Sequence, residues 1–165
     1  MPDELTGKTI LQITASADKI ILLAKEGGLY VFNQQNQKFE QIAHSAENFA
    51  VSPDNNKIAF WDKNGKLNIY FIEDYQNGIS KKAGDVIRFD YYLKTNGGDI
   101  KNIYWYKDSS HLFVENQTSI DFIEIDDRLP ANKYILNEGI SNSYYEQNSN
   151  RLYFIEKSNL NFIEI

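Results

Sequence analysis

Three adjacent ionisable residues, Asp126, Asp127 and Arg128, form the run in this chain that is best suited to chemistry. Paired carboxylates can bind a cation or act as a general acid and a general base. The same run is also typical of a solvated turn, in which the arginine pairs with a neighbouring carboxylate. Both interpretations stay open from the sequence.

Two histidines, His44 and His111, are the remaining candidates for proton transfer or metal binding. No carboxylate or second histidine stands at a metal-ligand spacing from His44, and His111 occupies a place in a repeat that otherwise holds lysine or arginine. The chain has no cysteine, which excludes a disulfide framework, a thiolate metal site and a cysteine nucleophile. It has no Gly-x-Ser-x-Gly elbow, although a triad assembled only in three dimensions stays open. We therefore expect that the protein is not an enzyme, that it has no catalytic residue, and that it binds no metal and no cofactor.

Two lysines lie in a long connecting segment. Lys81 and Lys82 belong to residues 75–84, and this segment and residues 94–99 flank a predicted strand at 85–93. Long loops on a rigid scaffold tend to carry recognition, so the two lysines would offer cations to an acidic partner. The alternative is a linker without a binding role.

Aromatic residues follow one another at Tyr104, Trp105 and Tyr106. On a strand, Tyr104 and Tyr106 would point to one face and Trp105 to the other. Such rings can form a stacking platform for sugars or peptides, and they can equally fill the space between two sheets. We expect packing to be their main role and keep Tyr104 and Tyr106 as candidate binding residues.

The elements that must position these residues come from a motif that occurs four times. Each copy has a short polar residue, two turn-forming residues, a basic residue and an aliphatic anchor, at 16–20, 54–58, 108–112 and 148–152. Two of the three intervals between anchors lie near the roughly 40–45 residues that one four-stranded propeller blade occupies. The middle interval is longer by about one loop, which is the segment that carries Lys81 and Lys82.

Every copy continues with a strand, a tight turn and a second strand. Gly27-Gly28 and Asn64-Gly65 are two-residue hairpin signals, because type I′ turns need positive φ at both central positions. Outer strands are predicted at 38–43, 85–93 and 133–136, and the fourth copy reaches residue 165 without one. The sequence therefore predicts an all-β fold, a β-propeller-like array of about four blades whose last blade is incomplete, with blades at 8–44, 46–93, 99–137 and 140–165.

A β-sandwich or barrel is the alternative to a propeller, and the apolar pattern of the strands bears on the choice. Residues 70–72 and 153–155 are apolar at consecutive positions, so both faces of these strands need cover. A sandwich strand with one wet face should alternate cleanly, whereas a propeller blade lies between two neighbouring sheets. The pattern favours the propeller.

Residues 52–60, Ser-Pro-Asp-Asn-Asn-Lys-Ile-Ala-Phe, resemble the Ser-Pro-Asp-Gly-x-x-Ile-Ala-Phe signature of TolB-like and related WD-type β-propeller repeats, with Asn55 in place of the glycine. Residues 103–112 and 122–128 resemble propeller segments of PEGA-domain bacterial envelope proteins. These resemblances imply a propeller fold and an extracytoplasmic binding or surface role. They bring no catalytic residues with them.

Charge and hydropathy limit the partners. A net charge of −6 and 17 scattered basic residues make a nucleic acid partner unexpected. No segment approaches the roughly 20 apolar residues of a membrane span, and residues 1–5 do not open a signal peptide, so we expect a soluble domain without direct membrane insertion.

We expect a non-catalytic interaction or scaffold module for a protein, peptide or glycan partner. The alternative is an accessory or substrate-gating propeller of a larger hydrolase, either a peptidase or a glycosidase. An unclosed array would expose large apolar sheet faces, so we also expect self-association or further blades to complete it.

Overall fold

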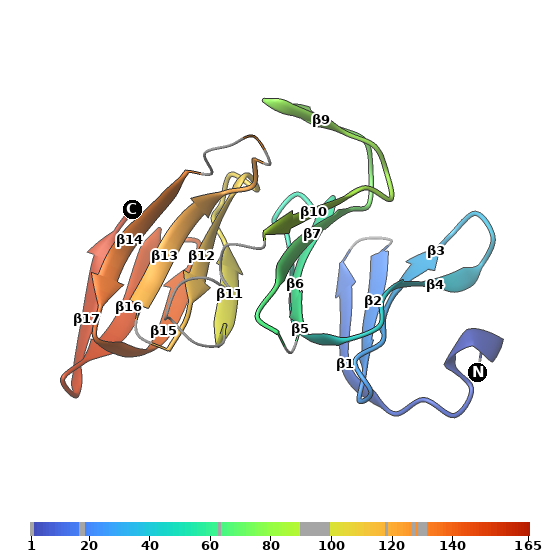
Figure 1. Ribbon diagram of the computed structural model, residues 1–165, viewed down its shortest axis with the longest axis horizontal. Coiled ribbons are helices and arrows are strands. Elements are labelled where there is room, and N and C mark those ends of the chain that lie inside the picture. The colour runs from blue at the N-terminus through green and yellow to red at the C-terminus, as the bar shows by residue number, and fades with distance from the viewer. Residues whose placement is uncertain are drawn as a thin grey trace.

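The computed structural model describes residues 2–16, 19–62, 64–89, 100–117, 119–126, 128 and 132–165. These residues form antiparallel sheets that follow one another along the chain in an open arc, from the N-terminal sheet to the C-terminal one (Figure 1). The all-β, propeller-like array predicted from the sequence is confirmed. Among the described residues, no helix is long and apolar enough to cross a membrane.

Each sheet of three or four strands is one blade, and its strands are given from the innermost to the outermost. The first blade contains β1 (Ile10–Ser16), β2 (Lys19–Ala24), β3 (Leu29–Asn33) and β4 (Lys38–Ala43). The second contains β5 (Ala46–Val51), β6 (Lys57–Asp62), β7 (Leu67–Phe71) and β10 (Val86–Phe89). The third contains β11 (Asn102–Trp105), β12 (His111–Glu115), β13 (Ser119–Glu124) and β14 (Lys133–Glu138). The fourth has three strands, β15 (Ile140–Glu146), β16 (Arg151–Glu156) and β17 (Asn159–Glu164).

The repeated motif forms the turn between the first two strands of a blade. Asp54 and Asp108 each accept backbone hydrogen bonds through Oδ1, from Asn56 N at 3.1 Å in the first case and from Ser110 N at 2.8 Å in the second. The residue after each aspartate has positive φ, 60° at Asn55 and 59° at Ser109. Asp, Asn and Ser favour this turn because their side chains bond to the backbone two residues on.

Apolar side chains fill the space between neighbouring blades. Tyr70 packs with the core between the first and second blades, and the adjacent Phe71 is fully buried in the core between the second and third. The third and fourth blades share a further core that includes Phe113 and Leu152. The consecutive apolar positions in the sequence therefore reflect sheets that are covered on both faces, as in a propeller.

Polar contacts cross the same interfaces. The Trp105 indole N–H of the third blade donates to the Ala50 carbonyl of the second at 3.0 Å. Glu115 is 3% exposed, and its Oε2 accepts from the Ser143 hydroxyl at 2.7 Å and from the Ser143 backbone N–H at 3.1 Å, which joins the third blade to the fourth. These bonds satisfy polar groups that would otherwise be buried without partners.

The N-terminal residues do not form an outer strand in the described part of the chain. The short 3-10 helix η1 (Asp3–Leu5) places Leu5 against Leu22 and Tyr30, on the face of the first blade that points away from the second. Leu5 is 4% exposed, so this segment covers part of that face.

The segment predicted as a loop at 75–84 contains a small hairpin, β8 (Tyr75–Asn77) and β9 (Ile79–Lys81). β10 lies where the sequence predicts an outer strand at 85–93, while residues 90–99, including the predicted loop 94–99, lie outside the described residues. β4 spans the predicted outer strand 38–43, and β14 extends the one predicted at 133–136.

Replacing Gly27 by alanine is expected to lower the free energy of unfolding by about 2 kcal/mol, with Gly7→Ala as the matched control at about 1 kcal/mol. Both glycines have positive φ, 93° and 78°, but only a Cβ at Gly27 would meet backbone, with Ser45 Cα at 3.0 Å. Urea denaturation of both variants measures the difference. Equal losses would mean that the close approach of the first blade's hairpin to the second blade is absent.

Candidate functional site

The β8–β9 hairpin interrupts the blade repeat between β7 and β10 and reaches the third blade. At its root, the Tyr75 hydroxyl lies 3.0 Å from the Ser110 hydroxyl, which belongs to the turn before β12. Gly78, with φ of 78°, makes the turn between the two short strands and lies beside the Arg128 guanidinium. The insertion therefore joins two blades on the side of the arc where the turns of the repeated motif lie.

A buried lysine fixes the root of the hairpin. The Lys57 ammonium lies 4.4 Å from the centroid of the Tyr75 ring and 2.6 Å from Asp54 Oδ2, and the lysine side chain is fully buried. The Tyr75 ring also packs against Phe71, with ring centroids 5.4 Å apart. Cation–π attraction is strongest where the cation is shielded from water, so Lys57 holds Tyr75 in place.

Burial of the Asp54 carboxyl alone would raise its pKa, but the hydrogen bonds from Lys57 and Ser52 outweigh that effect and hold the pKa below its ordinary value. Asp54 is therefore ionised at neutral pH and balances the Lys57 charge. Its backbone N–H also donates to the Ser109 hydroxyl oxygen at 3.0 Å, so the same turn is linked to the third blade.

A hollow of about 260 Å³ lies between the hairpin and the third blade, and we name it the hairpin cleft. Tyr75 and Ile79 line it from the hairpin, and Asp108, His111, Glu124 and Asp126 line it from the third blade. The cleft thus combines apolar hairpin side chains with three carboxylates of one blade, one from the turn before β12 and two from the end of β13 and the segment after it.

Each of the three carboxylates has a side-chain partner close by. The hydrogen bonds from Arg128, whose Nε lies 2.7 and 2.9 Å from the two Asp126 oxygens, hold the pKa of Asp126 below its usual range. Asp108 Oδ2 lies 2.6 Å from His111 Nδ1, and Glu124 Oε2 accepts from the Asn132 side-chain amide at 2.7 Å.

The charge of the cleft follows from these partners. Asp108, Glu124 and Asp126 place three carboxylates on its lining, and the Arg128 guanidinium offsets the charge of Asp126. The hairpin cleft is therefore suited to a cationic group.

The structure brings some of the predicted site residues together. Asp126 lines the cleft, Arg128 binds Asp126, and Lys81 stands close enough for its charge to lower the pKa of Asp126 further. Lys82 lies at the base of the hairpin, where its ammonium is 2.7 Å from Asp74 Oδ2. Asp127 lies outside the described residues.

The two tyrosines predicted as binding residues lie elsewhere, between the third and fourth blades. The Tyr104 hydroxyl donates to the Ser143 carbonyl at 2.5 Å, and burial raises the pKa of this tyrosine. The Tyr106 ring packs against Phe122 and Tyr145, with centroids 5.6 and 6.0 Å away. Both rings take part in packing between blades, which is the main role that the sequence analysis expects for them.

The histidines have different surroundings. The His111 ring stacks on Phe122 with centroids 4.9 Å apart and planes 5° apart, whereas His44 is exposed after β4. Within the part of the chain that the structure describes, no group of three or more His, Asp or Glu side chains could hold a metal ion.

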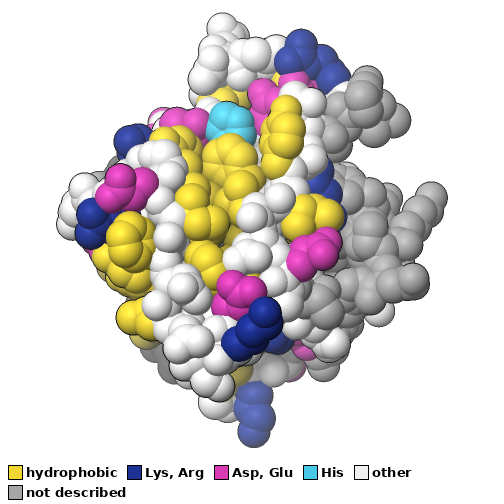
Figure 2. All heavy atoms as spheres, turned by 90° about the vertical axis from the view of Figure 1, so that its left-hand side faces the viewer, with side chains coloured by type: hydrophobic (Ala, Val, Ile, Leu, Met, Phe, Trp, Pro, Cys, Tyr) yellow, Lys and Arg dark blue, Asp and Glu magenta, His cyan; other side chains and the backbone are white. Residues whose placement is uncertain are grey.

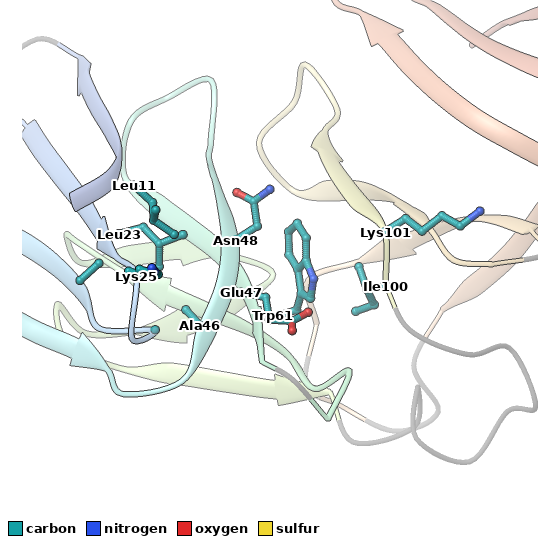
Figure 3. Close-up of a pocket in the computed structure, with 11 residues that line it drawn as sticks. Leu11, Leu23, Lys25, Ala46, Glu47, Asn48, Trp61, Ile100 and Lys101 are labelled. Carbon is teal, nitrogen blue, oxygen red and sulfur yellow. The ribbon is translucent and has the colours of Figure 1, made fainter. Parts of the chain in front are cut away.

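Sequence reasoning missed a second hollow of about 380 Å³, because its residues come from three blades (Figure 3). Leu11 lines it from the first blade, Asn48 and Trp61 from the second, and Ile100 and Lys101 from the third. They lie in or just before the innermost strands, except Trp61, which lies near the end of β6, and none belongs to a local motif. The contributions of Tyr75, Asp108 and Glu124 to the hairpin cleft were missed because these residues lie far apart in the sequence and only the fold brings them together. The length of the insertion pointed to its hairpin side alone.

Comparisons with known proteins identify the fold. No family model matches the chain, and no curated protein matches it in sequence. The β-propeller domain of Swd1 (Cps50) from Myceliophteria thermophila is similar in structure, with a TM-score of 0.67 and 8% identity over 96% of this chain and 54% of that domain. The dihydro-haem d1 dehydrogenase NirN gives a TM-score of 0.62 and 13% identity over 95% of this chain and 35% of its own length. A functionally unknown protein from Desulfotomaculum acetoxidans gives a TM-score of 0.57 and 18% identity over 95% of this chain and 52% of its own length.

The chain spans about half, or less, of the length of these structures. At such low identities the likeness concerns the fold alone. Together with the four successive sheets, it shows that this chain is an unclosed β-propeller.

Proposed function

We propose that this chain is a non-catalytic binding module whose hairpin cleft takes a basic side chain of a protein or peptide partner. The observation that supports this most strongly is the fold-back of the β8–β9 hairpin onto the third blade, which encloses three carboxylates beside apolar side chains. A lysine or arginine fits such a cleft, because its aliphatic stem packs on apolar surface while its charged end binds carboxylates.

The design of the cleft supports recognition rather than a structural role. The hairpin is an insertion into a regular repeat, and its root is fixed by Lys57 and Ser110. A binding loop that is held in place loses less conformational entropy when a partner binds. The partner would meet a cleft that is already formed.

The resemblances to TolB-like repeats and to PEGA-domain envelope proteins extend the proposal to a partner outside the cytoplasm. Protease accessibility of an epitope-tagged chain on intact bacterial cells tests this location. Digestion by added protease supports it, and full protection until the cells are lysed contradicts it.

Binding of short peptides tests the proposed function. The probes are two pools of fluorescein-labelled octapeptides, one rich in Lys and Arg and one rich in Asp and Glu, measured by fluorescence anisotropy. We expect the basic pool to bind and the acidic pool not to bind. Salt should weaken the binding because exposed charges are screened.

A double variant, Glu124→Gln with Asp126→Asn, assigns the binding to the cleft. We expect its affinity for the basic pool to fall by about tenfold or more, since two charge-assisted contacts become neutral. Glu138→Gln, at the end of β14 away from the cleft, is the matched control and should bind as the wild type does. Unchanged binding by the double variant, or preference for the acidic pool or for glycans on an array, would contradict the proposal.

A further inference from the structure

The fourth blade carries apolar side chains on the face that points away from the third. On this face Tyr153 lies opposite Phe162, and Ile155 lies opposite Leu160. Leu160 is 72% exposed and Phe162 is 51% exposed. The side of the molecule on which β17 lies in Figure 1 accordingly shows hydrophobic side chains gathered into a patch with charged side chains around it (Figure 2).

The same register positions are buried in the other blades. In the first blade, Ile21 lies opposite Val31 and Leu23 lies opposite Leu29, and all four pack in the core shared with the second blade. The corresponding residues of the second blade, among them Trp61 opposite Leu67, pack in the core shared with the third. The exposed face of the fourth blade therefore has the character of a blade-to-blade interface, and we name it the following face.

The first blade exposes the complementary face at the other end of the arc, which we name the preceding face. There Ile13 lies opposite Leu22 and is 66% exposed. Its equivalents Phe49 and Ile103, opposite Phe60 and Val114, are 5% and 3% exposed because they pack against the blade before them. Leu5 covers Leu22 in the first blade, but Ile13 on the innermost strand stays open.

We propose that a second copy of this chain closes the ring, with the following face of each copy packed on the preceding face of the other. Two arcs of four blades give eight, which is within the range of roughly four to eight blades that closed propellers have. The chain covers only 54% and 52% of two of the similar structures, so two copies match the length of a whole domain of this kind. A two-fold arrangement uses both end faces and leaves neither exposed to water.

Light scattering coupled to size-exclusion chromatography tests this arrangement. The wild-type chain is expected to have a mass of twice 19.1 kDa. Leu160→Asp on the following face and Ile13→Asp on the preceding face should each raise the dissociation constant by about 100-fold or more. The ring has two equivalent interfaces, so each substitution buries one charge in both of them. Ile135→Asp is the matched control, since Ile135 is 55% exposed on β14 but lies on neither end face, and this variant should remain a dimer.

Mixing the two variants distinguishes the head-to-tail ring from other dimers. A mixed pair of Leu160→Asp and Ile13→Asp chains keeps one interface with two wild-type faces, so an equimolar mixture should form dimers where each variant alone is monomeric. Circular dichroism melts of each variant verify that it is folded. A wild-type monomer at all concentrations, a dimer that Ile13→Asp leaves intact, an open series of larger oligomers, or a mixture that stays monomeric would each overturn the proposal.

Discussion

Replacing Trp105 by alanine is expected to lower the free energy of unfolding by about 4 kcal/mol. The Trp105 side chain is 5% exposed and packs in the core between the second and third blades. Its truncation leaves a cavity and removes the indole N–H that the Ala50 carbonyl accepts at 3.0 Å. Urea denaturation followed by far-UV circular dichroism measures the loss.

Trp105→Phe is the control for the hydrogen bond, because it keeps an aromatic ring at this position. We expect it to cost about 1–2 kcal/mol, most of it from the carbonyl that loses its donor. A loss below about 1 kcal/mol for Trp105→Ala would be far smaller than the cost of truncating a large side chain in a filled core. It would mean that the blades do not depend on one another for stability.

Replacing Lys57 by alanine is expected to destabilise the chain by about 3 kcal/mol, because the variant leaves the Asp54 carboxylate without its partner. Lys57 is fully buried and lies 2.6 Å from Asp54 Oδ2, while Asp54 keeps some contact with water. That contact with water limits the destabilisation to the lower end of the range seen when a buried ion pair loses one partner. Lys38→Ala on the exposed strand β4 is the control, with a change within about 0.5 kcal/mol.

The pH dependence of this difference identifies its cause. The pKa of Asp54 is lowered in the folded chain, so its stabilising contribution is complete above the unfolded pKa of about 4 and is lost as the pH falls through the folded value. The stability gap between the wild type and Lys57→Ala should therefore be constant from pH 7 to about pH 5 and should shrink below about pH 4. A gap that does not change in acid would mean that lost packing, and not the unpaired carboxylate, causes the destabilisation.

The fold could be predicted because its signals are local. The repeated turn, which begins with a short polar residue, recurs along the chain, and the adjacent apolar residues Tyr70 and Phe71 indicate that both faces of their strand are buried. The character of the segment after β7 could not be predicted, since two strands of three residues with one turn glycine have little apolar pattern of their own. The hairpin forms because Tyr75 packs on Phe71 and Lys57.

The candidate site could be predicted only in part. Asp126 and Arg128 stood out as a run, but nothing in the sequence joins them to Tyr75 and Asp108, which the third blade and the hairpin bring together. Lys57 occupies the basic position of the repeat, where a solvated side chain would be the ordinary interpretation, and it is fully buried. The hairpin that covers Lys57 is what separates it from the basic residues of the other repeats.

Mapping a bound peptide onto the chain by two-dimensional NMR tests the central claim, that the hairpin cleft is the binding site. The ¹⁵N-labelled chain is titrated with one Lys- and Arg-rich octapeptide, and the amide shifts are followed residue by residue. If the cleft binds the peptide, the largest shift changes will lie at residues 75–81, 108–111 and 124–126. Shift changes that gather instead around the hollow of Figure 3, or no changes at saturating peptide, would contradict it.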